Sequence, residues 1–230
     1  MRLIGQVKTF ATVVQGMDLL GHTEIWTKLF SLTSPRPGGI DIALWDIKGK
    51  AAGLPVFRIL GGTGTEVFTY ATGGYYLEGE PLDSATKELA GFVSNGYKAV
   101  KLKCGALSLK DEVARIKMVR EAIGPDVLFM LDMNAPYDVQ GCIAFANAVA
   151  PHDVFWLEEP LHWYLQPADF RRLADASPIP LAHGDHTRHP LHHAIYRGGA
   201  EVKDGMVHLT EAPGFGLEID WSAVGKCRAP

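Results

Sequence analysis

Residues 127–134 read VLFMLDMN, an apolar run that ends in an acidic residue, Asp132. Two later runs have the same form. VFWLEEP places Glu158 26 positions after that residue, and IPLAHGD places Asp185 another 27 positions on. An earlier run, AVKLKCG, contains Lys103, which stands 29 positions before Asp132. Each interval has room for a turn, a helix and the next short strand, so the spacing predicts consecutive βα units.

The acids and the lysines are expected to meet at one edge of a sheet, because parallel strands joined by right-handed crossovers all end on the same side. Carboxylates gathered there repel one another unless a cation neutralises them, and carboxylate-rich sites favour magnesium, or manganese, over zinc. Alternation along a strand puts Lys101 and Lys103 on the same face. The sequence therefore predicts a metal site formed by Asp132, Glu158 and Asp185, with two amines beside it.

Other interpretations of these residues are structural. The lysines also suit a solvated edge strand, and the acids suit a turn or a helix cap after a strand. Asn134 lies on the same strand face as Asp132, where an asparagine either contacts metal or substrate or forms a turn. His183 stands close to the third acid and is a candidate contact to substrate. Glu159 is expected to point away from Glu158 because strand neighbours alternate, which gives it a structural role.

The composition excludes several classes of function. The chain has 230 residues, of which 47% are hydrophobic, and a formal net charge of -4, which is enough apolar material for a large core. Basic residues are interspersed with acidic ones, so the charge pattern is not that of a nucleic-acid binder. No apolar run approaches the roughly 20 residues that span a bilayer, and the start lacks a secretory cleavage pattern. We expect a cytoplasmic protein with neither nucleic-acid nor membrane partners.

Three segments follow from the patterning. Residues 1–62 are expected to be mainly helical, with one helix in GGIDIALWDIKGKAAGLP that stops at Gly53 and Pro55. Residues 63–200 alternate between strands and helices and hold about five βα units, whereas a closed barrel needs eight. Residues 201–230 are expected to form a hairpin and a Gly/Pro loop. The predicted fold is α/β, a partial TIM-like (β/α) barrel whose open sheet has two edges.

Several motifs in matching order resemble the mandelate racemase and muconate lactonizing enzyme branch of the enolase superfamily. IDIALWDIKGKAAGLPVFRILGG resembles the junction between that family's capping domain and its barrel, and YKAVKLKCG resembles its Lys-x-Lys strand. LDMN, LEEP and IPLAHGD resemble its three metal-ligand strands. DGMVHLTEAPGFGLEID resembles the closing segment that returns to the capping domain. The resemblance implies that residues 1–62 are a remnant of the capping domain, and that residues 201–230 return to it.

The resemblance also implies a reaction. Lys103 is the expected base that removes the proton alpha to a carboxylate, and Lys101 is the expected partner of the substrate carboxylate. Magnesium, or manganese, would stabilise the resulting enolate. Two neighbouring ammonium groups disfavour each other's charged form, which predicts a lowered lysine pKa. The implied activity is a lyase reaction, dehydration of a sugar acid by a homo-oligomeric enzyme. A racemase, epimerase or cycloisomerase of the same superfamily is the near alternative.

The chain departs from the family pattern in three places. The first part of the capping domain has no counterpart before Met1, and strands six to eight are missing between Gly199 and Glu201. A histidine-aspartate pair that many members use as a second acid/base is missing with those strands. Asp185 stands where the family usually has the longer glutamate. These departures favour a hypothesis of another class, a catalytically inactive remnant that acts through subunit association.

Overall fold

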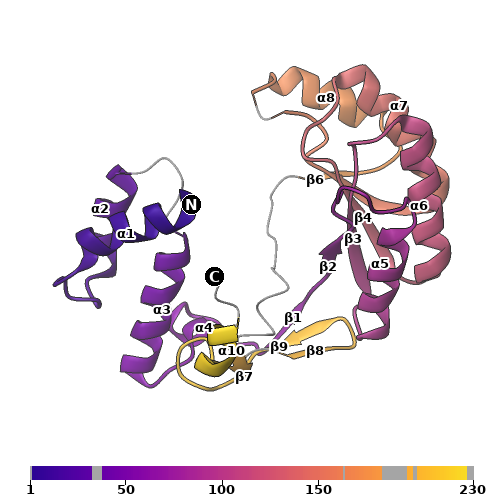
Figure 1. The fold of residues 1–230 in the computed structure, drawn as a ribbon. Helices are drawn as coiled ribbons and strands as arrows, with labels where there is room; N and C mark the ends of the chain where they lie inside the picture. Colours follow the sequence, from indigo (N-terminus) through magenta and orange to yellow (C-terminus); the bar gives the residue numbers. More distant parts are fainter. Residues whose placement is uncertain (1, 33–37, 163, 183–195, 199–200, 227–230) are drawn as a thin grey trace. The chain divides into compact units, whose positions relative to one another are not determined.

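The computed structural model divides the chain into two compact units (Figure 1). The first comprises residues 1–65, 191–200 and 209–230, and the second comprises residues 66–190 and 201–208. No helix in the described part of the chain is both long enough and apolar enough to cross a membrane. The structure describes residues 2–32, 38–162, 164–182, 196–198 and 201–226.

The first unit is largely helical, as the sequence predicts for its beginning. Its small core is formed by Phe10, Ile25, Leu29 and Leu44, which come from three helices. The short strands β7 and β10 pair antiparallel within the same unit. The elements are α1 (Arg2–Val14), α2 (His22–Leu32), α3 (Gly38–Ala52), α4 (Val56–Ile59), β7 (Tyr196–Gly198), β10 (Leu217–Ile219) and α10 (Trp221–Lys226).

The C-terminal loop approaches α3 closely inside this unit. A Cβ atom on Gly49 would lie 2.6 Å from the Cα atom of Gly214, so only glycine fits at that crossing. The amide of Phe215 donates a hydrogen bond to Oδ1 of Asp46 at 2.9 Å. The helix itself ends before Gly53, whose φ of 67° is typical of a helix C-terminus, and this confirms the predicted stop.

The second unit contains a five-stranded parallel sheet with the strand order β2-β3-β4-β5-β6. This confirms the predicted partial barrel with about five βα units. Among the described residues β2 and β6 each pair with a single neighbouring strand, so the sheet has two edges there. The strands are β2 (Ala71–Gly73), β3 (Ala99–Lys103), β4 (Leu128–Asp132), β5 (Val154–Glu158) and β6 (Leu181–Ala182).

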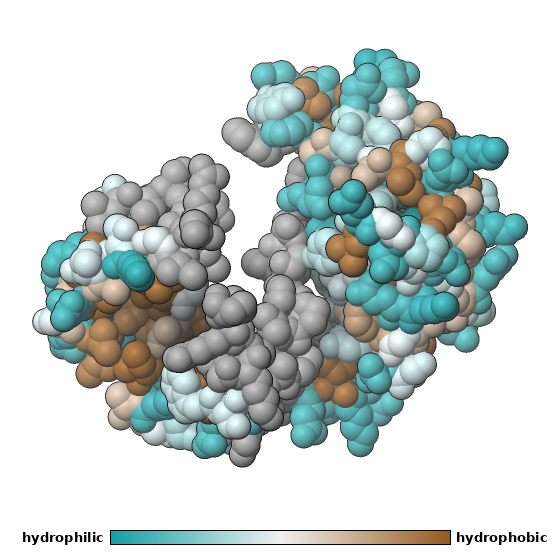
Figure 2. Space-filling view, in the orientation of Figure 1, coloured by the Kyte–Doolittle hydropathy of each residue, from teal (hydrophilic) through white to brown (hydrophobic). Residues whose placement is uncertain are grey.

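Helices cover one face of this sheet (Figure 1). Two of them begin at residues whose side chains cap the first turn. Ser108 accepts a hydrogen bond from the amide of Asp111, and Asp138 accepts one from the amide of Gly141 at 2.7 Å. The space-filling view shows mainly hydrophilic residues over this unit (Figure 2), as expected of amphipathic helices. The helices are α5 (Ser84–Ser94), α6 (Leu109–Ile123), α7 (Val139–Val149), η1 (Ala150–His152) and α8 (Pro167–Ala176).

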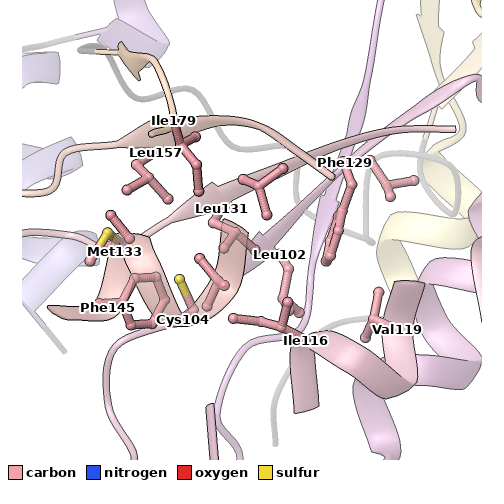
Figure 3. Close-up of a cluster of buried hydrophobic side chains, with 14 of the residues drawn as sticks. Leu102, Cys104, Ile116, Val119, Phe129, Leu131, Met133, Phe145, Leu157 and Ile179 are labelled. Atoms are coloured by element: carbon pink, nitrogen blue, oxygen red, sulfur yellow. The ribbon is translucent and has the colours of Figure 1, made fainter. Parts of the chain in front are cut away.

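The main core lies between the sheet and these helices (Figure 3). Leu102, Phe129, Leu131 and Leu157 are fully buried on the helix-facing side of three adjacent strands. Each such side chain contributes about 1.5–3 kcal/mol when it leaves water. Side chains alternate between the two faces along a strand. Because these apolar residues pack against the helices, Lys101 and the residues on its side of the sheet lie on the opposite face.

A second sheet in this unit is antiparallel and contains β1 (Glu66–Phe68), β9 (Met206–His208) and β8 (Glu201–Lys203). The last two strands form the predicted hairpin. Its turn residues, Asp204 and Gly205, have φ values of 51° and 77°, as tight hairpin turns require. The strands β1 and β2, which only Thr69 and Tyr70 separate in the sequence, therefore belong to different sheets.

Candidate active site

Strand register brings three of the predicted site residues into one row. Lys103 pairs with Asp132 across β3 and β4, and Asp132 pairs with Glu158 across β4 and β5. All three stand at the C-terminal ends of their strands. The row continues on β6, where Ala182 pairs with Glu158. The predicted residues His183 and Asp185 follow that strand, but they lie outside the described residues.

The charged side chains at this edge are buried and contact one another. The exposed fraction is 0% for Lys101 and Asp132, 2% for Glu158 and 5% for Lys103. Nζ of Lys101 lies 2.6 Å from Oε1 of Glu158 and 3.2 Å from Oδ2 of Asp132. Nζ of Lys103 lies 2.6 Å from that same Oδ2 atom. Burial and pairing of this kind rule out a solvated edge strand for the two lysines.

The carboxylates decide the charge state of Lys101. Burial by itself lowers the pKa of this amine, but the hydrogen bond to Glu158 and the negative charge of Asp132 outweigh burial, so the pKa is raised above its ordinary value. The lowered lysine pKa that the sequence predicts from two neighbouring amines is therefore wrong for Lys101. Lys101 contacts two carboxylates, and attraction at these distances exceeds the repulsion from the neighbouring amine.

The geometry fits a cation between the two acids. Asp132 and Glu158 both contact the ammonium group of Lys101, so their carboxylates already converge on one positive charge. Their oxygen atoms are the hard donors that magnesium prefers. No cluster of three or more His, Cys, Asp or Glu side chains suited to a metal occurs in the part of the chain that the structure describes. The described residues thus supply two of the three predicted ligands.

Asn134 and Glu159 extend the site beyond the strand ends. Lys103 donates from Nζ to Oδ1 of Asn134 at 3.0 Å, and Asn134 donates from Nδ2 to Oε2 of Glu159 at 3.2 Å. Both residues have left-handed backbones, with φ values of 48° and 45°. Such conformations are costly for residues other than glycine and concentrate at functional sites. The predicted alternation places Glu159 away from the site, but the chain leaves the extended conformation at this residue and returns its carboxylate to Asn134.

Two aromatic residues that the sequence pattern did not single out lie beside the buried ion pairs. Trp156 donates from Nε1 to Oε2 of Glu158 at 3.2 Å, and Nζ of Lys101 lies 5.2 Å from the ring centroid of Tyr70. Apolar rings next to an ion pair exclude water and strengthen its electrostatic interactions. The position of Trp156, two residues before Glu158 on the same strand face, is a signal for its role. Tyr70 lies between two short strands and gives no such signal.

A buried charged pair on α6 was also not predicted from the sequence. Glu112 and Arg115 are 0% and 3% exposed. Their partners are backbone groups of the loops that follow β2 and β3, together with the hydroxyl group of Tyr76. The spacing of three residues on a helix is common in solvated ion pairs, so the sequence offers no sign that this pair is buried.

Comparison with known proteins agrees with this arrangement. Residues 84–190 match the family described as "Enolase C-terminal domain-like", and residues 21–61 match "Mandelate racemase / muconate lactonizing enzyme, N-terminal domain". Arabinonate dehydratase from Saccharolobus solfataricus is 37% identical over 168 residues, covering 69% of this chain and 44% of the relative. D-galactarolactone cycloisomerase from Agrobacterium fabrum is 32% identical over 219 residues, covering 86% and 57%. The chain spans about half the length of these curated relatives.

The fold has counterparts among solved structures. A racemase from Streptomyces coelicolor A3(2), solved with bound magnesium, matches with a TM-score of 0.77 at 24% sequence identity, over 95% of this chain and 84% of that one. This likeness concerns the fold, whereas the two family matches concern the sequence, one over a segment that contains α3 and the other over most of the second unit. Taken with the order of the motifs, they show that the chain belongs to the mandelate racemase and muconate lactonizing enzyme branch of the enolase superfamily.

Proposed function

We propose that this chain removes the proton alpha to the carboxylate of a sugar acid in a magnesium-dependent reaction, and that the product forms by dehydration. The observation that carries the proposal is the buried row in which Lys103, Asp132 and Glu158 stand side by side at the strand ends. The names of the relatives support the substrate class, since they include an arabinonate dehydratase and a galactarolactone cycloisomerase.

The two lysines suit different tasks. The raised pKa of Lys101 keeps its amine charged, which suits it to pair with the carboxylate of a substrate. Lys103 stands at the end of its strand, closer to the loops, and acts as the base once its amine has lost its proton. The carbon–hydrogen bond then breaks, the proton passes to Nζ of Lys103, and the electron pair remains on the substrate as an enolate. Asn134 holds this Nζ from a second side.

Asp132 and Glu158 would hold the divalent cation, together with Asp185. When bound, magnesium supplies a Lewis acid that stabilises the negative charge developing on the substrate. The ammonium groups of Lys101 and Lys103 neutralise the same carboxylates. A divalent cation held by Asp132 and Glu158 would therefore compete with both amines for these oxygen atoms.

Two other functions remain as alternatives. Racemisation or cycloisomerisation shares the first proton transfer with dehydration, and the named cycloisomerase relative favours it. The products separate these reactions, because dehydration alone releases water and forms a 2-keto-3-deoxy acid. A catalytically inactive chain that associates through its sheet is favoured by the two strand edges in the described region.

The experiment begins with the metal. Wild type is compared with the double variant Asp132→Asn plus Glu158→Gln during magnesium titration, followed by calorimetry and thermal unfolding. A ligand at 100 times its Kd stabilises a protein by about 2.7 kcal/mol, so wild type should gain stability and the variant should not. Asp126→Asn, which changes an exposed aspartate, is the control and should behave like wild type. An equal response of wild type and the double variant would remove Asp132 and Glu158 from the metal site.

The second arm measures the chemistry. Sugar acids including arabinonate are incubated in deuterium oxide with magnesium, and incorporation of deuterium alpha to the carboxylate is followed by NMR. We expect incorporation with wild type and with Lys110→Met, an exposed lysine, and none with Lys103→Met. Wild type that binds magnesium but never exchanges the proton of any sugar acid would favour the inactive alternative.

A further inference from the structure

A buried charged pair on α6 holds the two loops that flank the candidate base. Glu112 and Arg115 lie in the first turns of this helix and are almost completely buried. Charged groups are expensive to bury unless hydrogen bonds satisfy them, so their partners indicate what the pair is for. Those partners are backbone atoms at the C-terminal ends of β2 and β3.

Arg115 connects the two strands beyond their regular pairing. The β2–β3 ladder ends at Gly73, opposite Leu102. Past that point, Nη1 of Arg115 donates to the carbonyl oxygen of Lys103 at 2.7 Å, and Nη2 donates to the carbonyl oxygen of Gly74. One planar guanidinium group thus holds the end of the lysine strand and the loop after β2 at a fixed separation.

Glu112 holds the next residues of the lysine loop. Its Oε1 atom accepts hydrogen bonds from the amides of Gly105 at 2.8 Å and Leu107 at 3.0 Å, and from the hydroxyl group of Tyr76. The guanidinium of Arg115 lies 4.5 Å from the ring centroid of Tyr76, so both charged residues also contact one tyrosine from the loop after β2. The backbone around Lys103 is consequently fixed on both sides by α6.

We propose that Glu112 and Arg115 are positioning residues for Lys103, which rests on the proposed function of that lysine as the base. Nζ of Lys103 must sit between Asp132 and Asn134, at 2.6 and 3.0 Å from their oxygen atoms. A displacement of about 1 Å at a reacting group lowers a rate on the order of 100-fold. A rigid carbonyl clamp at the residue that carries the amine limits such displacements.

The same helix supplies a matched control. Arg120 also binds backbone carbonyls, namely those of His152, Gly124, Val127 and Asp153. Val127 and Asp153 directly precede β4 and β5, so this second arginine acts at the opposite, N-terminal ends of the strands. In (β/α) barrels the active-site residues lie at the C-terminal ends of the strands, whereas residues at the N-terminal ends contribute to stability. Arg120→Met and Arg115→Met should both destabilise the fold, but only Arg115→Met should affect Lys103.

The first readout does not depend on activity. The wild-type chain and both variants, kept below their unfolding temperatures, are treated with an amine-reactive reagent, and labelling of Lys103 is measured by mass spectrometry. Arg115→Met should label faster at Lys103 than wild type, and Arg120→Met should label at the wild-type rate. An unchanged labelling rate in Arg115→Met would overturn the inference, whatever the enzyme does. Equal acceleration in both variants would also overturn it, because that is the result of general loosening.

The second readout is deuterium exchange into a substrate. Arg115→Met should lower kcat on the order of 10–100-fold with a smaller change in KM, since the amine and not substrate binding is displaced. Arg115→Lys retains a charged donor group without the planar fork of the guanidinium, and it should restore part of kcat. Altered labelling in Arg115→Met combined with no exchange by wild type would leave the positioning role intact and refute the proposed function instead. Unchanged kcat in Arg115→Met, beside an active wild type, would refute the positioning role.

Discussion

The two faces of the five-stranded sheet differ in what holds their buried side chains. On the helix-facing side, Leu102, Phe129 and Leu131 are buried among other apolar residues. On the other side, Lys101 and Asp132 are equally buried, but they are held by ion pairs. The same strands carry both sets. The first face contributes stability in proportion to apolar area, whereas the second retains charges whose burial costs free energy.

The largest effect is expected on the apolar face. Phe129→Ala removes a fully buried aromatic ring and should lower the free energy of unfolding by about 3–5 kcal/mol, because a cavity remains that neighbours fill only in part. Urea unfolding measures this loss, and magnesium should not restore it. Leu128→Ala, at the partly exposed start of the same strand, is the control and should cost much less. Comparable losses in the two variants would contradict the assignment of the core to one face.

The charged face should respond differently to the loss of one residue. Lys101→Met leaves Glu158 without its lysine partner and should cost roughly 3 kcal/mol, at the lower end for a broken buried pair, because Lys103 still neutralises Asp132. Magnesium should recover more stability in this variant than in wild type, since the cation no longer competes with that ammonium group. Thermal unfolding with and without magnesium measures the difference.

A lysine on the surface gives the control for that experiment. Lys117→Met removes an exposed partner of Glu121 and should change stability by less than about 0.5 kcal/mol, with the magnesium response of wild type. If Lys101→Met were as stable as wild type without metal, the ion pairs would not be what holds the charged face together.

The dependence of the free energy of unfolding on alkaline pH should sharpen the comparison of the two faces. The pKa of Lys101 is raised above its ordinary value of 10.5 in the folded protein, so the unfolded chain loses this proton first as pH rises. The contribution of Lys101 is fully present below pH 10.5 and disappears as pH passes through the folded-state pKa. The stability difference between wild type and Lys101→Met should therefore be constant at neutral pH and shrink above 10.5. A stability difference that widens above pH 10.5 would show that the pKa of Lys101 is lowered, and not raised, in the folded protein.

The row of site residues was predictable from the sequence because the topology of parallel strands alone determines it. Parallel strands end on one edge, so acids and amines at the ends of apolar runs meet there whatever the fine detail. Lys103, Asp132 and Glu158 satisfy this rule. The caps at Ser108 and Asp138 were predictable for a similar reason, since a cap is a contact within three residues of sequence.

The rest of the site depends on distances that no local pattern contains. The pKa direction of Lys101 is set by two carboxylates on other strands, and only the register between strands places them. Glu159 departs from the predicted alternation because its φ of 45° ends the strand one residue after Glu158. The burial of Glu112 depends on the loops that pack over α6, and a helical sequence pattern says nothing of those loops.

The smallest expected effect compares the two ends of β5. Asp153 and Glu159 flank this strand and both have left-handed backbones, at φ values of 52° and 45°. Glycine adopts this conformation without a Cβ clash, so Asp153→Gly, at an exposed position, should stabilise the fold by about 0.5 kcal/mol in urea unfolding. Glu159→Gly relieves the same strain but removes the carboxylate that holds Asn134, and through it Lys103. It should gain less stability and exchange substrate protons more slowly. A larger gain for Glu159→Gly, with exchange unaffected, would show that the strained backbone of Glu159 does not contribute to the position of Lys103.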